Sequence, residues 1–421
     1  MSDRESHRAS DRAGAWVRRE IVGDLHAADA LPRVVSGQVV TPAGVPYRHL
    51  YVHVPFCARR CSYCDFSIAV RRVVPVDDFV ASLALELAAR FGAPANDLAP
   101  SPSLETLYLG GGTPSRLGGD GVAQVIALVT RFAALAPNAE VTVEANPEDV
   151  SPAAVTAWRD AGVNRVSLGV QSFDPDVLAW MHRTHDVDAI HAAARTLAEH
   201  GMANWSLDLI YALPGEISRD WTRDLEEAIA LRPAHISAYG LTVEQGTPLS
   251  RWRARGGVHD ASEERYEADF LLAHERLAVA GYRHYEVSNW GLPGLESRHN
   301  SSYWSGVPYL GIGPAAHGFD GATRRWNERD FVRWRASALA QRDPVGGEET
   351  LTPDERALEE AYVGLRTLQG VPVGEGDQPL VSRWIAEGWA EMRDRRLVLT
   401  PHGWLRLDAL VSALTEHRSR Y

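Results

Sequence analysis

A repeated strand-then-helix pattern constrains the fold of this chain more than any other feature of its sequence. Short runs rich in β-branched residues alternate with loops and amphipathic segments, and six such runs begin at Leu50, Leu104, Glu140, Arg165, Trp205 and His235. Between the early runs, apolar residues recur with helical spacing, at Val80, Leu83, Ala84 and Leu87 and again at Val122, Val125, Ile126 and Val129. No dinucleotide-binding glycine pattern follows the first run. The repeats therefore predict an α/β fold in which a parallel sheet curls into an incomplete, TIM-like (β/α)6 barrel.

The sequence divides into four parts around this barrel. Residues 1–46 are polar and arginine-rich, then rich in Pro and Gly, so we expect a flexible N-terminal extension. The barrel core takes residues 47–290, and residues 291–345, rich in Trp, Gly and Pro, are expected to close the barrel mouth. Residues 346–421 are expected to form a small C-terminal helical domain, in which Thr400 caps a final helix that begins at Pro401.

Charge and composition exclude several classes of function. All 43 basic residues are arginine, so the chain cannot form a lysine Schiff base or use the lysine of a phosphate-binding loop. The formal net charge of −12 argues against a surface that tracks phosphates, and we expect no nucleic acid partner. No apolar run reaches the length of a membrane span, and the N-terminus lacks the apolar core of a secretory signal. We therefore expect a cytoplasmic protein.

The three cysteines, Cys57, Cys61 and Cys64, lie within eight residues of one another, directly after the first predicted strand. Three thiolates at this spacing can hold three corners of a four-iron, four-sulfur cluster and leave the fourth iron without a protein ligand. The amino and carboxylate groups of S-adenosylmethionine can chelate that iron, and one-electron reduction of the sulfonium then gives a 5′-deoxyadenosyl radical. The alternatives are a structural zinc site completed by His53, or three buried cysteines. Zinc usually takes two separated ligand pairs, and the sequence offers no second pair.

The segment YVHVPFCARRCSYCDF, which contains the three cysteines, resembles the radical S-adenosylmethionine superfamily. Its surroundings look like the branch that contains oxygen-independent coproporphyrinogen III dehydrogenase and the heme chaperone HemW. The resemblance runs from about Leu50 to the C-terminus and leaves the N-terminal extension unexplained. It implies a [4Fe-4S] cluster on Cys57, Cys61 and Cys64, with S-adenosylmethionine as the second cofactor.

The same resemblance assigns contacts with S-adenosylmethionine to the ends of the predicted strands, where the reactive groups of such barrels gather. In LYLGGGTPS, the backbone of Gly111 and Gly112 and the hydroxyl of Thr113 would take the methionine amino group, because glycine lets the backbone approach a ligand closely. Arg183 could pair with the methionine carboxylate. The other implied positions are Tyr51, Glu144, Gln171 and Asp208. Taken singly, each is also an ordinary polar residue of a loop.

Two features bear on which part of the branch the chain resembles. In coproporphyrinogen dehydrogenases a further cysteine follows the third cysteine after one residue, whereas this chain has Phe66 there, as in the chaperone pattern. In SRHNSSYW, four residues reproduce the HNxxYW motif associated with heme binding, namely His299, Asn300, Tyr303 and Trp304. By this resemblance His299 would ligate the heme iron, and Tyr303 and Trp304 would provide flat apolar surface for the porphyrin.

Two details qualify the heme assignment. Ser297 stands where chaperone sequences often have a cysteine, which excludes a covalent heme linkage through that residue. The segment GIGPAAHGF resembles another shared segment of the branch, and its His317 is a second candidate ligand. A glycine turn with a packed histidine is the alternative interpretation of that segment.

The resemblance therefore implies a protein that binds heme and transfers it to an acceptor protein, which the sequence does not identify. A homodimer and turnover of a substrate are both left open. The rival hypothesis is an oxygen-independent coproporphyrinogen III dehydrogenase, which would use the adenosyl radical to decarboxylate propionate side chains, and a third is a radical enzyme with an unrelated substrate. Residues 346–421 resemble the branch's small helical domain, which has a winged-helix look, and we expect them to pack against the barrel rather than bind DNA.

Overall fold

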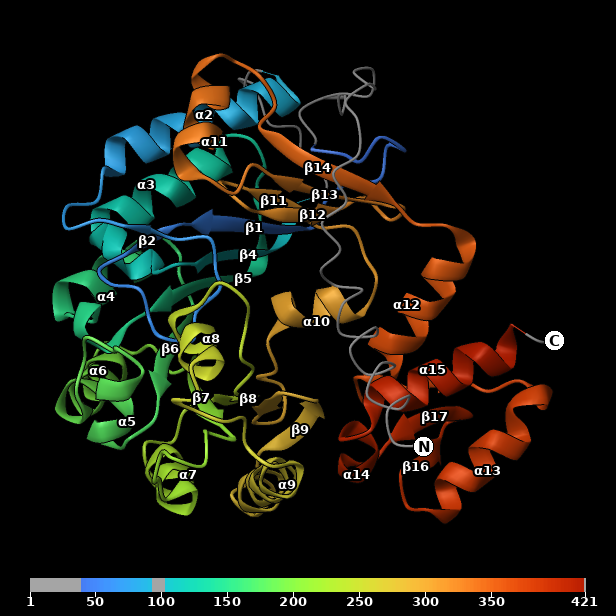
Figure 1. Ribbon diagram of the computed structural model, residues 1–421. Helices are drawn as coiled ribbons and strands as arrows, with labels where there is room; N and C mark the ends of the chain where they lie inside the picture. Colours follow the sequence, from blue (N-terminus) through green and yellow to red (C-terminus); the bar gives the residue numbers. More distant parts are fainter. Residues whose placement is uncertain (1–38, 93–102, 420–421) are drawn as a thin grey trace.

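The computed structural model describes residues 39–92 and 103–419 (Figure 1), and its largest element is a nine-stranded sheet. The strands lie in the order β11-β1-β4-β5-β6-β7-β8-β10-β9. Each of the six predicted runs is a strand, and each pairs in parallel with the next: β1 (His49–Val54), β4 (Leu104–Gly111), β5 (Leu135–Ala145), β6 (Arg165–Gln171), β7 (Trp205–Tyr211) and β8 (His235–Gly240). The prediction of an α/β fold with a curled parallel sheet is confirmed.

Three further strands extend the sheet beyond the six that the sequence predicts. β10 (Asn289–Gly291) and β9 (Arg283–Glu286) continue it past β8 in antiparallel orientation, and β11 (Leu310–Ile312) pairs in parallel with β1. Each is three or four residues long, too short for an alternating pattern to show in the sequence. β11 and β9 form the two edges, so the barrel is open.

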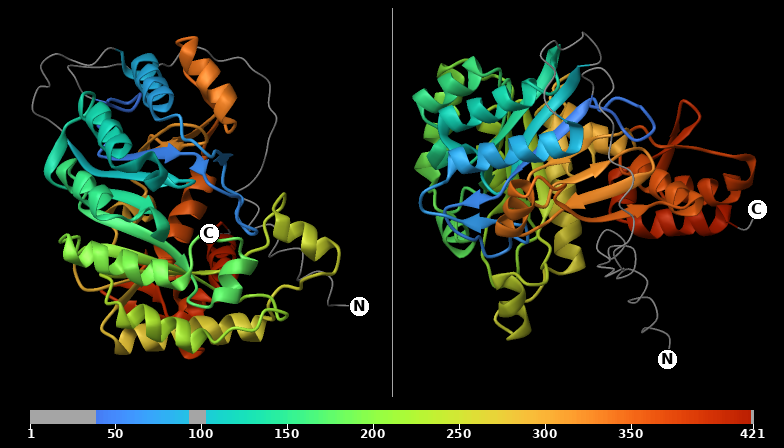
Figure 2. Two further views of the ribbon diagram at one scale, coloured as in Figure 1. Left: turned by 90° about the vertical axis from the view of Figure 1, so that its left-hand side faces the viewer. Right: turned by 90° about the horizontal axis from the view of Figure 1, so that it is seen from above.

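Helices cover the outer face of the curved sheet (Figure 2), and polar side chains line its inner face. On β1 the outward residues Leu50, Val52 and Val54 are at most 1% exposed, whereas the residues between them, such as Tyr51 and His53, point inward. The helices of the βα units are α2 (Val76–Phe91), α3 (Gly118–Thr130), α4 (Pro152–Asp160), α5 (Pro175–Trp180), α6 (Val187–Glu199), α7 (Trp221–Ala230), α8 (Pro248–Ala254) and α9 (Glu263–Val279). The two predicted apolar helix faces lie on α2 and α3 and pack into the core.

The segment expected to close the barrel mouth lies at both ends of the barrel. α10 (Arg298–Trp304) sits at the N-terminal ends of β4 and β5, because the Arg298 guanidinium donates to the Asn138 carbonyl at 2.6 Å. The later part reaches the opposite end, where the Ser67 hydroxyl donates to the Arg329 carbonyl. Its elements are a three-stranded sheet, β12 (His317–Phe319), β13 (Thr323–Asn327) and β14 (Val345–Thr350), and α11 (Phe331–Leu339). The prediction that residues 291–345 close the barrel mouth is therefore incomplete, because part of this segment lies at the opposite end.

The C-terminal part combines helices with a second three-stranded sheet (Figure 1). Thr400 caps a helix that begins at Pro401, as predicted, but this helix ends at Trp404 and a separate one follows, so the single final helix was wrong. The elements of the C-terminal part are α12 (Pro353–Leu365), β15 (Val371–Pro372), η4 (Glu375–Asp377), α13 (Gln378–Ala386), β16 (Ala390–Arg393), β17 (Arg396–Leu399), α14 (Pro401–Trp404) and α15 (Leu407–Arg418).

The expected flexible extension, residues 1–46, is described only from residue 39. Val39, Val40 and Thr41 are buried, and the Val40–Pro46 bridge closes a turn, so these last residues pack onto the body of the protein. Residues 1–38 lie outside the described part of the chain. No helix within 39–92 or 103–419 combines the length and the apolar character that crossing a membrane requires.

Candidate functional site

The cysteine loop lies at the C-terminal end of β1, between β2 (Phe56–Cys57) and β3 (Ala69–Val70). Cys57 is buried, and Cys61 and Cys64 are half-buried. Two side chains reach the sulfurs from outside the cysteine loop: the Thr113 hydroxyl, just after β4, lies 3.5 Å from Cys57 Sγ, and a guanidinium nitrogen of Arg183, in the loop after α5, lies 3.4 Å from Cys61 Sγ. The fold thus brings the thiols together with two of the residues expected to bind S-adenosylmethionine.

The environment of the thiols suits a metal cluster that supplies positive charge. Burial raises the pKa of the Cys57 thiol and raises that of Cys64 to about 12. Thiols in such surroundings stay protonated unless a metal draws off the proton, which is how a coordinating iron acts. The neighbouring cysteines also raise the pKa of Cys64, so the three sulfurs are close enough to interact electrostatically. The donor set therefore fits three corners of an iron-sulfur cluster.

A single zinc ion completed by His53 fits poorly. The His53 imidazole is engaged at both nitrogens, with the Ser67 carbonyl at 3.0 Å and the Tyr51 hydroxyl at 3.3 Å. Among the residues that the structure describes, no three His, Cys, Asp or Glu side chains converge tightly enough to surround one metal ion. The thiolates of a cubane cluster bind separate irons, so their sulfurs stand further apart than the ligands of one ion.

The glycine-rich end of β4 passes closely beside β1. Gly111 has a φ of +112°, and a Cβ placed on it would lie 2.6 Å from the His53 ring, so a side chain is excluded both by conformation and by space. A Cβ on Gly112 would lie 2.7 Å from the Pro55 backbone. The chain then turns into η2 (Pro114–Leu117), which leaves Thr113 directed at the cysteine loop.

Glu144, at the end of β5, is tied to this glycine turn. Its carboxylate accepts hydrogen bonds from the Gly111 amide at 2.9 Å and from the Tyr108 hydroxyl at 2.8 Å. Burial, with a smaller contribution from the charge of Asp208, raises the pKa of Glu144 to about 7. The carboxyl group can therefore carry or release a proton near neutral pH. Sequence reasoning missed Tyr108 as its partner.

Arg183 reaches across the end of β6. Its guanidinium donates to the Asn146 side-chain oxygen at 2.7 Å and to the Gly169 carbonyl at 2.9 Å, in addition to its contact with Cys61. Gln171 lies beside the same strand end, because a Cβ on Gly169 would come within 3.0 Å of the Gln171 amide nitrogen. Gln171 itself has a φ of +73° at a bulge in the pairing of β6 with β7. Asn146 was not predicted from the sequence.

Asp208 and Tyr51 complete the predicted set from opposite sides of the barrel interior. The Asp208 carboxylate on β7 accepts from the Ser167 hydroxyl at 3.0 Å, and burial raises its pKa. The Tyr51 ring on β1 stacks on Tyr108, with ring centroids 6.0 Å apart. All eight residues expected to contact S-adenosylmethionine thus lie on the inner face of the sheet or at its C-terminal end.

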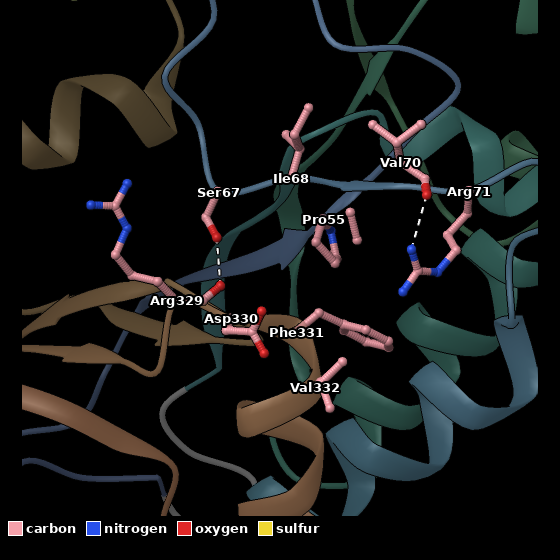
Figure 3. Close-up of a pocket in the computed structure, with 10 residues that line it drawn as sticks. Pro55, Ser67, Ile68, Val70, Arg71, Arg329, Asp330, Phe331 and Val332 are labelled. Atoms are coloured by element: carbon pink, nitrogen blue, oxygen red, sulfur yellow. Dashed lines mark hydrogen bonds between the residues drawn. The ribbon is translucent and has the colours of Figure 1, made fainter. Parts of the chain in front are cut away.

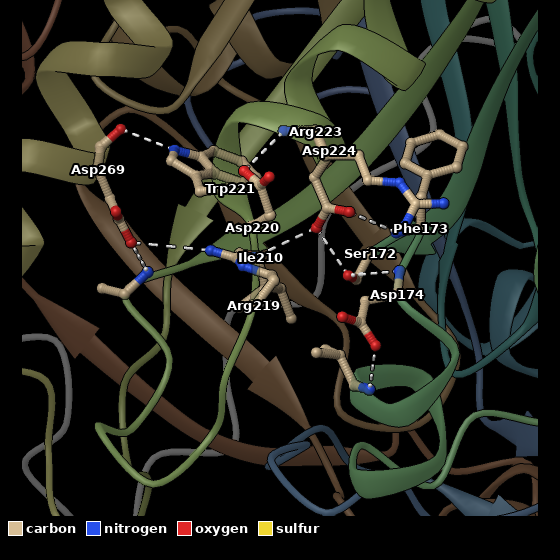
Figure 4. A network of polar contacts seen from close by, with 12 residues as sticks. Ser172, Phe173, Asp174, Ile210, Arg219, Asp220, Trp221, Arg223, Asp224 and Asp269 are labelled. Carbon is tan, nitrogen blue, oxygen red and sulfur yellow. Dashed lines mark hydrogen bonds and ion pairs between the residues drawn. The ribbon is translucent and has the colours of Figure 1, made fainter.

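A buried ion-pair network fixes the backbone next to Gln171 and at the end of β7 (Figure 4). The Asp224 carboxylate accepts from the Ser172 hydroxyl at 2.7 Å and from the Phe173 amide at 2.9 Å. The Arg219 guanidinium, which is fully buried, lies 3.5 Å from Asp224 and donates to the Ile210 carbonyl. Because these contacts join the loops after β6 and β7, they hold the strand ends that carry the site.

His299, the expected heme ligand, is enclosed in the barrel interior next to Tyr108 and Tyr51, and its ring stacks on theirs with centroids 5.0 Å and 6.4 Å apart. It is 1% exposed, its Nδ1 lies 2.7 Å from the Thr106 hydroxyl, and its Nε2 lies 2.8 Å from the Tyr303 hydroxyl. Burial lowers its pKa to about 3, so the ring is neutral. The Glu140 carboxylate accepts from the His299 amide at 2.9 Å and thereby anchors the first turn of α10. Neither ring nitrogen is open to iron in this arrangement.

The other residues of the HNxxYW motif also make internal contacts. Ser297 is the N-cap of α10, and its side chain accepts from the Asn300 amide, a role that serine fills well. The Tyr303 ring meets Tyr309 edge to face, with ring centroids 4.7 Å apart. The Arg366 guanidinium lies 4.4 Å from the centre of the Trp304 ring and ties α10 to the C-terminal part. Heme binding by these four residues stays a prediction.

A cleft of about 500 Å³ opens beside the cysteine loop (Figure 3). One wall is the segment that leads into β3, including Ile68 and Val70, and the other is the start of α11, including Phe331 and Val332. Arg329 stands at the rim. This cleft, which combines apolar walls with a guanidinium, was not predicted, because its two walls lie more than 250 residues apart in the sequence.

Comparison with known proteins assigns the chain to a family. Residues 51–228 match the radical SAM superfamily. The heme chaperone HemW of Mycobacterium tuberculosis is 39% identical over 374 residues, which cover 87% of this chain and 94% of that protein. The chain belongs to the HemW family. The heme chaperone HemW of Escherichia coli is 37% identical over 277 residues, which cover 65% of this chain and 70% of that protein.

Membership in the radical SAM superfamily implies a [4Fe-4S] cluster and S-adenosylmethionine as cofactors of this HemW-family chain. Among solved structures, coproporphyrinogen III oxidase (HemN) from Escherichia coli, a radical SAM enzyme, superposes with a TM-score of 0.71 at 20% sequence identity. The superposition covers 87% of this chain and 89% of that one. At this identity the likeness shows that the two proteins share a fold.

Proposed function

We propose that this protein binds heme and passes it to an acceptor protein, with an iron-sulfur cluster and S-adenosylmethionine bound at the barrel mouth. The observation that carries the proposal is the 39% identity with a heme chaperone over 94% of that protein's length. A match over 87% of this chain includes most of the barrel and α10. The cargo, heme, and the acceptor are inferred from that relationship.

The cluster is proposed to be held by Cys57, Cys61 and Cys64. Their burial and mutual proximity support this assignment, as does the Arg183 guanidinium beside Cys61, which offsets the negative charge of a thiolate-ligated cluster. When bound, the cluster supplies an electron to the sulfonium of S-adenosylmethionine. β2, which ends at Cys57, and the loop that follows it carry the three cysteines.

The contacts with S-adenosylmethionine are proposed to come from the inner face of the sheet. Backbone groups at Gly111 and Gly112 and the Thr113 hydroxyl lie nearest the cysteine loop and suit the amino group. Arg183 suits the carboxylate, since a guanidinium binds a carboxylate with two parallel hydrogen bonds. The side chains that remain for the ribose, the adenine and the packing beneath them are Tyr51, Glu144, Gln171 and Asp208.

The alternative function is oxidative decarboxylation of coproporphyrinogen III. Phe66 argues against it, because its phenyl ring is 57% exposed on the cysteine loop, at the position where the dehydrogenases are expected to have a further thiol. A phenyl ring offers no thiol for chemistry or for a metal. The shared fold with HemN carries no weight for either function, since the fold hosts many reactions.

Parallel assays on the anaerobically reconstituted full-length protein test the proposal. We expect one heme bound per chain in a hemin titration followed at the Soret band. We also expect no decarboxylated product from coproporphyrinogen III in the presence of S-adenosylmethionine and a reductant. Product formation without heme binding would refute the chaperone function and favour the dehydrogenase.

A further inference from the structure

The cleft beside the cysteine loop has a guanidinium group on either side of an apolar lining. Figure 3 shows Arg71 and Arg329 on opposite sides of the apolar side chains, which include Val70 and Val332. Val70 is 46% exposed and Val332 is 63% exposed, so both valines are open to solvent. An exposed apolar patch with a polar rim is typical of a surface that binds another protein. None of the residues expected to contact S-adenosylmethionine lines this cleft.

The guanidinium groups of this surface are available to a partner. Within residues 39–92 and 103–419, neither Arg71 nor Arg72 nor Arg329 forms an ion pair with a carboxylate, and all three are exposed. Asp330, the carboxylate in the cleft lining, is already the N-cap of α11 and accepts from the Arg333 amide at 3.0 Å. In a chain with a formal net charge of −12, these arginines form a local positive surface, which attracts an acidic partner.

This surface is joined directly to the strand that carries Cys57. The Arg71 amide donates to the Cys57 carbonyl at 3.0 Å, and β3 pairs with β2 in parallel. Arg116, which follows the glycine turn, donates to the Arg71 carbonyl at 3.1 Å. On the other side of the cleft, the Ser67 hydroxyl donates to the Arg329 carbonyl. A protein bound over the cleft would therefore lie next to the cysteine loop without displacing S-adenosylmethionine.

We propose that this surface docks an acidic protein that reduces the iron-sulfur cluster by one electron. Before an electron can pass to the sulfonium, the cluster has to receive one from outside the chain. That electron leaves a reduced flavin or iron-sulfur centre of the partner and takes the cluster from its 2+ to its 1+ state, and no bond forms or breaks. Complexes for electron transfer bury less than about 1,200 Å², so a small surface suffices. The inference goes beyond the proposed function, since it concerns the cluster and not heme.

Binding of a bacterial flavodoxin, a small acidic flavoprotein, to the full-length protein tests the docking surface. We expect binding that weakens as salt is added, because salt screens exposed charges. Arg71→Glu combined with Arg329→Glu should raise the dissociation constant by about tenfold or more, and Val332→Ala should raise it less. After anaerobic reconstitution, reduction of the cluster by reduced flavodoxin, followed by electron paramagnetic resonance, should slow by a similar factor. The extent of reduction by dithionite should match the wild type.

Matched variants place the same changes elsewhere on the surface. Arg195→Glu combined with Arg223→Glu alters the net charge equally, at exposed positions on α6 and α7 away from α11 (Figure 1), and should bind flavodoxin like the wild type. Val279→Ala, at an 85% exposed position on α9, is the control for Val332→Ala and should also change nothing.

Three results would overturn the inference. The first is a wild-type protein that binds no flavodoxin, and the second is equal weakening by the two pairs of arginine substitutions. The third is loss of binding to phosphatidylglycerol vesicles in the Arg71 and Arg329 variant with flavodoxin binding unchanged, which would assign the surface to a membrane. A protein that binds flavodoxin as expected but takes up no hemin would refute the proposed function alone.

Discussion

The buried carboxyl group of Glu144 should make the stability of the protein depend on pH in a predictable direction. Its pKa rises from an ordinary value of 4.5 in the unfolded chain to about 7 in the folded protein. The folded state therefore keeps a proton that the unfolded state loses between pH 4.5 and 7, and the free energy of unfolding falls across that window. At about 1.4 kcal/mol per pH unit, the full loss is about 3 kcal/mol.

Glu144→Gln removes the titration and retains groups that can bond to Gly111 and Tyr108. Urea unfolding of wild type and variant, without S-adenosylmethionine, gives the difference in their free energies of unfolding at each pH. We expect wild type to lose about 3 kcal/mol relative to the variant between pH 4.5 and 7.5, and nothing further above that. A difference that stays flat, or that rises with pH, would refute the reasoning.

Glu355 provides the control for this experiment. Its pKa is lowered by hydrogen bonds from the Thr352 amide and hydroxyl at the start of α12. A lowered carboxyl pKa contributes stability that is present above the unfolded value and is lost only as pH falls below it. The difference between wild type and Glu355→Gln should therefore be constant from pH 4.5 to 7.5.

Two further substitutions probe the supports of the site. Asp224→Ala leaves the Arg219 guanidinium buried without its closer carboxylate, and we expect a loss of about 3 kcal/mol in the free energy of unfolding, measured in urea. Gly112→Ala places a Cβ within 2.7 Å of the Pro55 backbone, and we expect a loss of about 1–3 kcal/mol together with a lower iron content after reconstitution.

Matched controls separate these effects from a general sensitivity to substitution. Asp260→Ala breaks an exposed ion pair with Arg253, and it should cost at most about 1 kcal/mol. Gly215→Ala introduces a Cβ with open space around it and should leave iron content unchanged. If Asp224→Ala costs no more than Asp260→Ala, the buried network does not support the strand ends. If Gly112→Ala keeps the wild-type iron content, the glycine turn is not needed to hold the cluster.

The six barrel strands could be predicted because each has enough β-branched residues to show a pattern by itself. The outward residues of β1, such as Leu50 and Val52, are apolar because they pack against helices. The other barrel strands are also covered by helices and need apolar residues for the same reason. β11, with three residues, and β14, with the polar sequence VGGEET, carry no such pattern. Their pairing is decided by neighbours that are remote in the sequence.

The candidate site, like the fold, could be predicted from the sequence only in part. Residues after the strands were expected to converge, because the C-terminal ends of parallel strands meet at one end of a barrel, and Thr113 and Arg183 do meet the cysteine loop. The contacts of His299 with Thr106 and Glu140 could not be anticipated, because these partners are 193 and 159 residues away, whereas Tyr303 is only four residues along the helix. The family resemblance identifies the motif, but it does not show whether the ring nitrogens of its histidine already have hydrogen-bond partners.

The central claim is that three neighbouring thiolates hold an iron-sulfur cluster with one open iron, and it is tested most directly by iron and sulfide analysis after anaerobic reconstitution. We expect about four irons per chain in the wild type, a perturbed electron paramagnetic resonance signal on adding S-adenosylmethionine, and loss of both when Cys57, Cys61 and Cys64 are all replaced by alanine. Zinc in the anaerobically purified protein, or iron loading that survives the triple replacement, would contradict the account.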